Sequence, residues 1–159
     1  MYVCVCMLYS LVTHQKPGFH FQLFITKNPT PPMAPLNGGF YTHPKLPANN
    51  TSGMVTVSIE QPPTLRWVFL DANTHEMRWG TMADSEGHTC GPFDWTRDEQ
   101  YVTLENWEGW LAVRLPEDQN PGQKEEIWRL YFDQNDDGAG LPAGAQGLEI
   151  RLHRIAAES

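Results

Sequence analysis

Apolar residues at every second position recur from residue 54 onward, and this spacing most constrains the fold. In the last such segment Leu148, Ile150 and Leu152 alternate with polar residues, as in a strand with one buried face. Residues 65–70 are mostly apolar on both faces, which is typical of a central strand. No segment has convincing helical spacing, and 13 glycines and 13 prolines disfavour helices further. The pattern therefore predicts an all-β fold, a single antiparallel β-sandwich or small barrel of about six to eight strands.

Proline content divides the chain into a leader and a folded unit. Residues 1–27 are apolar, and residues 28–53 carry six prolines without apolar periodicity, which predicts an irregular Pro-rich N-terminal arm. We therefore expect residues 1–53 to lie outside the core, with residues 1–32 dispensable for folding. Residues 54–155 are predicted to form a single β domain, followed by a tail at 156–159.

The charge balance restricts the partners. Eleven basic and nineteen acidic residues give a net charge of −8, and no basic cluster occurs, which excludes nucleic acid and anionic membrane surfaces. The apolar run at residues 1–12 is shorter than the roughly 20 residues of a membrane span. The expected partner is a small molecule, a glycan or a protein, with no cofactor.

Cysteine usage and the N-terminal run bear on the compartment. Three cysteines, an odd and sparse set, are typical of a reducing compartment and predict a cytoplasmic protein. Residues 1–12 resemble the apolar part of a secretion signal, but no basic residue precedes them and no cleavage site follows. Secretion is kept as the alternative.

Tryptophan is the strongest compositional feature, with six residues interleaved with acidic side chains. Indole rings stack on sugars and flat ligands, and neighbouring carboxylates bind hydroxyl groups. The predicted ligand-binding residues are Trp95, Glu105, Trp107, Glu108 and Trp110. Trp107 falls in a turn and is expected to be the most exposed. The competing interpretation is that the indoles only fill the core, in a structural protein without a ligand.

A small acid/base enzyme is the second functional hypothesis. Its candidate catalytic residues are His88 together with Asp94 or Glu105, because proton transfer requires a positioned carboxyl or imidazole group. On an extended segment His88 and Cys90 share a face, so they could also be two metal ligands or an activated thiol.

The segment 133–138 matches the first half of a calcium loop, with Asp133, Asn135 and Asp137 at the ligand positions and Gly138 at the bend. The second half fails, because Gly144 stands where a bidentate Glu is required. The sequence therefore predicts an acidic turn and no metal site, with weak calcium binding in the loop as the alternative.

Residues 67–73 and 129–135 resemble each other, with identical Asp and Asn positions after a strand-like run. Both predict a strand that ends in a turn where the Asp side chain accepts a backbone N–H two residues on. The likeness arises from convergent turn chemistry or from an internal duplication.

Four blocks of the folded unit resemble a known group of proteins. They are T-H-E-x-R-x-G at 74–80, G-P-F-D-W-T at 91–96, L-E-x-W-E-G-W at 104–110 and Y-F-D-x-N-D-D-G at 131–138. They are similar to the shared blocks of small uncharacterised proteins from filamentous fungi. The resemblance implies a fungal source and a domain boundary after the leader, and it implies no activity or catalytic residues.

Overall fold

The chain is built from short β-strands, and the part that the structure describes contains no helix. The structure is a computed structural model that describes residues 3–5, 8–11, 21–26, 33–42, 52–57, 62–116 and 127–155. The strands in chain order are β1 (Val3–Val5), β2 (Leu8–Leu11), β3 (Phe21–Ile25), β4 (Met33–Pro35), β5 (Gly38–Thr42), β6 (Ser52–Val57), β7 (Leu65–Leu70), β8 (Met77–Gly80), β9 (Phe93–Trp95), β10 (Val102–Leu104), β11 (Trp110–Arg114), β12 (Trp128–Phe132) and β13 (Gln146–Leu152). The all-β prediction is confirmed, although these strands outnumber the six to eight expected.

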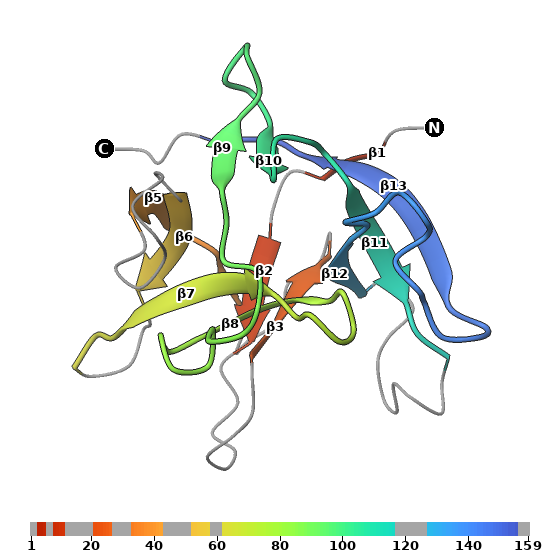
Figure 1. Cartoon of the computed structure of the whole chain (residues 1–159), viewed down its shortest axis with the longest axis horizontal. Coiled ribbons are helices and arrows are strands. Elements are labelled where there is room, and N and C mark those ends of the chain that lie inside the picture. The colour runs from red at the N-terminus through yellow and green to blue at the C-terminus, as the bar shows by residue number, and fades with distance from the viewer. Residues whose placement is uncertain are drawn as a thin grey trace.

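Eleven strands form one large sheet, and β9 and β10 form a separate hairpin. The main path of the sheet runs β1-β13-β11-β12-β3-β8-β7-β6-β5, and off this path β2 pairs with β3 and β4 pairs with β2. All pairs are antiparallel except β1 with β13. Figure 1 shows the β9–β10 hairpin in green, apart from the large sheet. Antiparallel neighbours are what short connections between strands produce.

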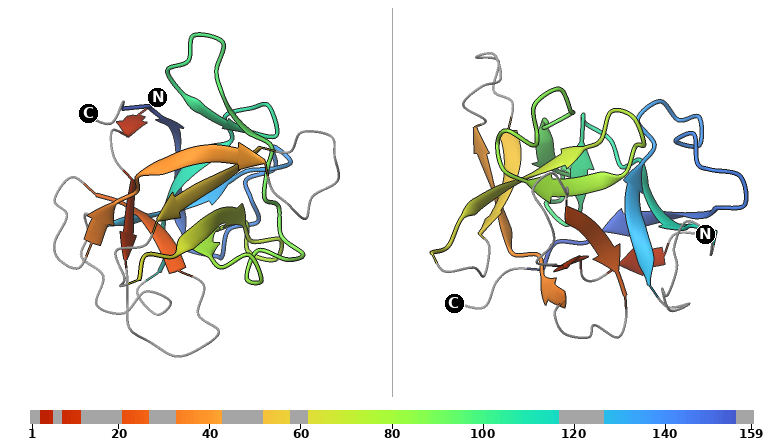
Figure 2. Two further views of the ribbon diagram at one scale, coloured as in Figure 1. Left: turned by 90° about the vertical axis from the view of Figure 1, so that its left-hand side faces the viewer. Right: turned by 90° about the horizontal axis from the view of Figure 1, so that it is seen from below.

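The large sheet curls around one core, to which the hairpin also contributes (Figures 1 and 2). Trp79 and Trp110 are among the largest fully buried side chains, because a bulky indole fills much of the space inside a small β domain. The other buried members come from β3, β6 and β7 through β13: Leu23, Ile25, Met54, Val68, Leu70, Met77, Phe93, Val102, Leu104, Ala112, Leu130, Phe132, Ile150 and Leu152.

A smaller cluster covers the opposite face of β11 and β12. It consists of Leu111, Val113, Leu115, Tyr131 and Ala139, with Leu141 and Ala145 packed against it. The segment that follows β12 therefore folds back over the outside of the sheet. Both faces of β11 are buried as a result, as its unbroken apolar run indicates.

The prediction that residues 1–53 lie outside the core is wrong for β3. Leu23 has 0% of its surface exposed and Ile25 has 8%. β3 pairs with both β8 and β12, so it closes the sheet between the two halves of the chain. A run of five β-prone residues is sufficient for a strand whatever the proline content that follows it. The predicted boundary at 53/54 falls inside β6, and residues 156–159 lie outside the described residues.

The predicted inward face of β13 is correct for its second half only. Ile150 and Leu152 are buried, but Leu148 is 45% exposed. The first half of β13 pairs with β11, whereas the second half pairs with β1. Leu148 therefore lies on the half of β13 for which β11 is the one strand neighbour among the described residues.

Candidate functional site

Three strands end in the same way, with a buried apolar residue followed by an acidic one. The pairs are Leu70–Asp71, Leu104–Glu105 and Phe132–Asp133, and the three apolar residues are fully buried. The sequence comparison found only the first and the third. The second was missed because β10 is three residues long and gives little periodic signal.

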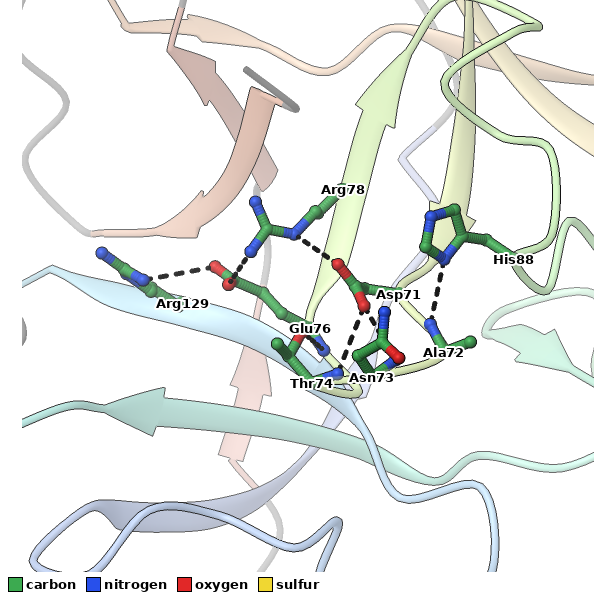
Figure 3. Close-up of polar contacts among 8 residues, drawn as sticks. All are labelled: Asp71, Ala72, Asn73, Thr74, Glu76, Arg78, His88 and Arg129. Carbon is green, nitrogen blue, oxygen red and sulfur yellow. Dashed lines mark hydrogen bonds and ion pairs between the residues drawn. The ribbon is translucent and has the colours of Figure 1, made fainter. Parts of the chain in front are cut away.

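Asp71 forms the predicted turn. Its Oδ1 accepts the backbone N–H groups of Asn73 at 2.8 Å and Thr74 at 3.2 Å, and its Oδ2 lies 3.2 Å from Arg78 Nε (Figure 3). Burial alone raises the pKa of Asp71, but these N–H groups, Arg78 and His88 outweigh it and lower the pKa below its usual value. The side chain therefore stabilises the turn as a carboxylate.

Glu76 is a buried carboxylate beside the same turn. Only 1% of its surface is exposed. Its Oε2 lies 3.2 Å from Arg78 Nη2, and its Oε1 lies 3.7 Å from Arg129 Nη1 (Figure 3). Burial raises the pKa of Glu76 against the opposing attraction of Arg129 and Arg78. Burial and the Glu76 charge also raise the pKa of Tyr131 to about 12. These groups join β8 to β12 and line neither of the pockets described below.

Asp133 uses its carboxylate on its own loop. It accepts the backbone N–H groups of Asp137 at 3.0 Å, Gly138 at 3.0 Å and Ala139 at 3.1 Å. An acidic residue that holds three N–H donors in this way closes a turn. The described residues contain no group of three His, Cys, Asp or Glu side chains that could hold a metal ion.

His88 and Cys90 do not form an activated pair. His88 Nδ1 accepts the N–H of Ala72 at 3.0 Å (Figure 3), and its ring stacks on Phe69. Cys90 is buried, and its thiol donates to the carbonyl of Ser85 at 3.3 Å. Burial raises the pKa of the Cys90 thiol, which is the opposite of what a nucleophile requires.

The other two candidate catalytic residues are the carboxylates Glu105 and Asp94. Glu105 accepts both of its hydrogen bonds from the Gln134 amide at 3.1 Å, and it lines neither pocket. Asp94 is exposed and accepts the N–H of Trp95. Asp94 lines the second pocket described below, whereas His88 and Glu105 line neither of the two.

The larger pocket, here the Arg151 pocket, lies between the β10–β11 turn, the loop after β12 and strand β13. Its volume is about 480 Å³, within the usual range of small-ligand sites. Three of the predicted ligand-binding residues line it: Trp107, Glu108 and Trp110. The remaining lining residues are Gly109, Leu111, Asp133, Asp136, Glu149, Ile150 and Arg151.

Trp107 is half-buried and held in one place. Its ring packs edge-on against Phe132 with 5.6 Å between centroids, and its backbone pairs with Leu104. A Cβ at Gly109 would stand 2.6 Å from the Trp107 ring and 2.8 Å from the carbonyl oxygen of Asp133. Only glycine leaves room for the indole to lie against the chain at this position.

Glu108 and Arg151 form a bidentate pair at the edge of the pocket. Arg151 Nε and Nη2 donate to the two Glu108 oxygens at 2.9 and 2.8 Å. The Arg151 guanidinium also lies 3.5 Å from the centre of the Tyr101 ring. Paired hydrogen bonds and a stacked ring fix both charged groups in orientation.

The second pocket, here the Arg97 pocket, adjoins the first because Trp107 and Glu108 line both. Its volume is about 430 Å³. The fourth predicted residue, Trp95, lies here, half-buried against Phe40. Its remaining lining residues are Asp94, Thr96, Arg97, Thr103 and Asn106.

The six tryptophans divide into two groups. Trp67, Trp79 and Trp110 are buried, whereas Trp95, Trp107 and Trp128 are half-buried. Trp107 and Trp95 line pockets, and Trp128 lines neither.

The sequence analysis did not identify three residues that line the Arg151 pocket: Asp136, Glu149 and Arg151. The available signal was the polar face of β13, which places Glu149 and Arg151 on the same side.

The strands and their aromatic clusters define the chain as an all-β domain. A family model described as "Fungal beta-trefoil domain" matches residues 13–158, nearly the whole chain. The chain belongs to this family, and its fold is therefore a β-trefoil and not a simple sandwich. No curated protein and no solved structure matches the chain significantly. The described residues contain no helix that could cross a membrane.

The family assignment also bears on the resemblance of the four sequence blocks to fungal proteins. The likeness to fungal proteins is confirmed at the level of the family. The match begins at residue 13, inside the segment expected to be a leader, which agrees with the place of β3 in the core.

Proposed function

We propose that this domain binds glycans in the Arg151 pocket, with the Trp107 ring as the surface on which a sugar stacks. The observation that carries the proposal is the position of Trp107, half-buried and rigidly held between two adjoining pockets. A fixed indole stacks on the C–H face of a sugar without an ordering cost. That trefoil domains often bind glycans supports the same choice among the possible ligands.

The polar lining of the pocket suits hydroxyl groups. Asp136 and Glu149 are exposed, and among the described residues neither side chain has a hydrogen-bond or ion-pair partner. Ionised carboxylates are pure acceptors, so they take hydrogen bonds from sugar hydroxyls. Arg151, whose Nε and Nη2 already donate to Glu108, adds the remaining N–H donors of its guanidinium to the pocket.

The charge of the pocket narrows the class of glycan. The pocket is lined by one guanidinium, that of Arg151, and by four acidic residues: Glu108, Asp133, Asp136 and Glu149. This excess of negative charge repels the carboxylate of an anionic sugar, which disfavours sialic and uronic acids as ligands. The proposed ligands are therefore neutral or cationic sugars.

A glycan array followed by titration calorimetry with the bound sugars tests the proposal. The Trp107→Ala variant is expected to bind at least about 30-fold more weakly, the equivalent of the roughly 2 kcal/mol that a central aromatic contact contributes. Trp128→Ala is the matched control, because Trp128 is also half-buried but lines neither pocket. Thermal unfolding verifies that both variants are folded.

Two results would refute the proposal. One is an array on which no glycan binds the folded wild-type protein. The other is a Trp107→Ala variant that binds as tightly as wild type while remaining folded. Equal losses in the Trp107 and Trp128 variants would point to a general effect on the fold instead.

A further inference from the structure

We infer that the recognised glycan is a chain of at least two linked sugars that occupies both the Arg151 pocket and the Arg97 pocket; this inference rests on the proposed function. The two pockets adjoin at Trp107 and Glu108, which line both. Their volumes are about 480 and 430 Å³, so each falls within the range of a separate small-ligand site. A single sugar bound to either pocket would leave the other unused.

The two pockets offer different hydrogen-bonding groups. Free acceptors prevail in the Arg151 pocket, where Asp136 and Glu149 have no partner among the described residues. In the Arg97 pocket the exposed side chains of Arg97 and Asn106 likewise have no described partner, and they add donors. Sugar hydroxyls both donate and accept, so neighbouring units of one chain can satisfy both sets.

Another polar side chain that lines the Arg97 pocket, that of Thr96, is already engaged. The Thr96 hydroxyl donates to Asp98 Oδ1 at 2.5 Å and accepts the N–H of Tyr101 at 3.1 Å. These bonds fix the loop that carries Arg97, so the loop position does not depend on a ligand. Arg97 is the cationic group that lines this pocket, and it has no partner among the described residues.

The ridge between the pockets is also fixed. Trp107 packs on Phe132 and along Gly109, and Glu108 is held by both nitrogens of Arg151. A chain that crosses such a ridge gains contacts on each side without reorganising the protein. The second sugar unit is therefore expected to increase the affinity and not merely to be accommodated without added contacts.

Titration calorimetry with free sugars of increasing length tests this inference. The probes are glucose, galactose and N-acetylglucosamine, each with its linear di-, tri- and tetrasaccharide. Affinity is expected to rise by at least about tenfold from one unit to two in the series that binds, the equivalent of one added hydrogen bond to a charged group. Equal affinity for one unit and two would overturn the inference.

The Arg97→Ala variant separates the pockets. It is expected to lower disaccharide affinity about tenfold, by loss of its charged hydrogen bond, and to leave monosaccharide affinity unchanged. Gln100→Ala is the control, because Gln100 is an exposed residue of the same loop that lines neither pocket. A folded Arg97→Ala variant with unchanged disaccharide affinity would overturn the inference while leaving glycan binding intact. Failure of all three series together with a silent array would instead refute glycan binding itself.

Discussion

Replacing Leu23 by alanine tests whether β3 belongs to the core, from which the boundary predicted at 53/54 would exclude it. Leu23 has 0% of its surface exposed and lies in the main core cluster. Truncating a fully buried leucine costs about 3–5 kcal/mol, because the lost transfer energy adds to the cavity left behind. For a domain of this size each kcal/mol lowers Tm by roughly 2–4 °C. We expect Leu23→Ala to lower Tm by at least about 6 °C.

Urea unfolding followed by tryptophan fluorescence measures the free energy of unfolding directly. Gln22→Ala is the matched control, because Gln22 is the adjacent residue of β3 and only half-buried. We expect it to change stability by about 1 kcal/mol or less. If Leu23→Ala unfolded at the same urea concentration as wild type, β3 would not pack in the core.

Two further predictions concern the acidic residues. Asp133→Ala is expected to lower the free energy of unfolding by about 1–3 kcal/mol because three backbone N–H groups lose their acceptor, whereas Asp137→Ala should lower it by about 0.5 kcal/mol or less. Differential scanning fluorimetry with and without calcium measures both variants. A calcium-dependent rise in Tm that Asp137→Ala abolishes would contradict the assignment of this loop as a simple turn. Folding raises the pKa of Glu76, so the native state binds the proton of this carboxyl group more tightly than the unfolded state does. The contribution of Glu76 to the free energy of unfolding therefore falls as the pH rises from the ordinary pKa of 4.5 through the raised value. The difference in unfolding free energy between Glu76→Gln and wild type should therefore shift in favour of the variant over that range in urea titrations, and a difference that is constant with pH would show that the pKa is not raised.

Strands β7 and β8 of the folded unit were predictable because each carries its own signal. Four consecutive residues of β7, Trp67 to Leu70, are buried as the apolar run predicted, and Met77 and Trp79 share the buried face of β8. The wider arrangement was not predictable in this way. A trefoil and a sandwich use the same alternation of apolar residues, so period alone does not distinguish them.

Only part of the candidate site was predicted from the sequence. Trp107 and Glu108 stood out because they occupy one turn motif, and the structure places both at the junction of two pockets. Arg151 did not stand out, since it lies 43 positions from its partner Glu108. Contacts of this kind depend on which strands become neighbours, here β11 and β13, and short-range patterns do not contain that information.

The junction shared by the two pockets also constrains how ligand preference can change by mutation. A substitution at Trp107 or Glu108 alters both halves of the cavity at once, whereas Arg97 belongs to one half and Glu149 to the other. The outer walls can therefore diverge independently while the centre stays constant. Among proteins that retain this centre, diversity in selectivity is expected to concentrate at the two flanks.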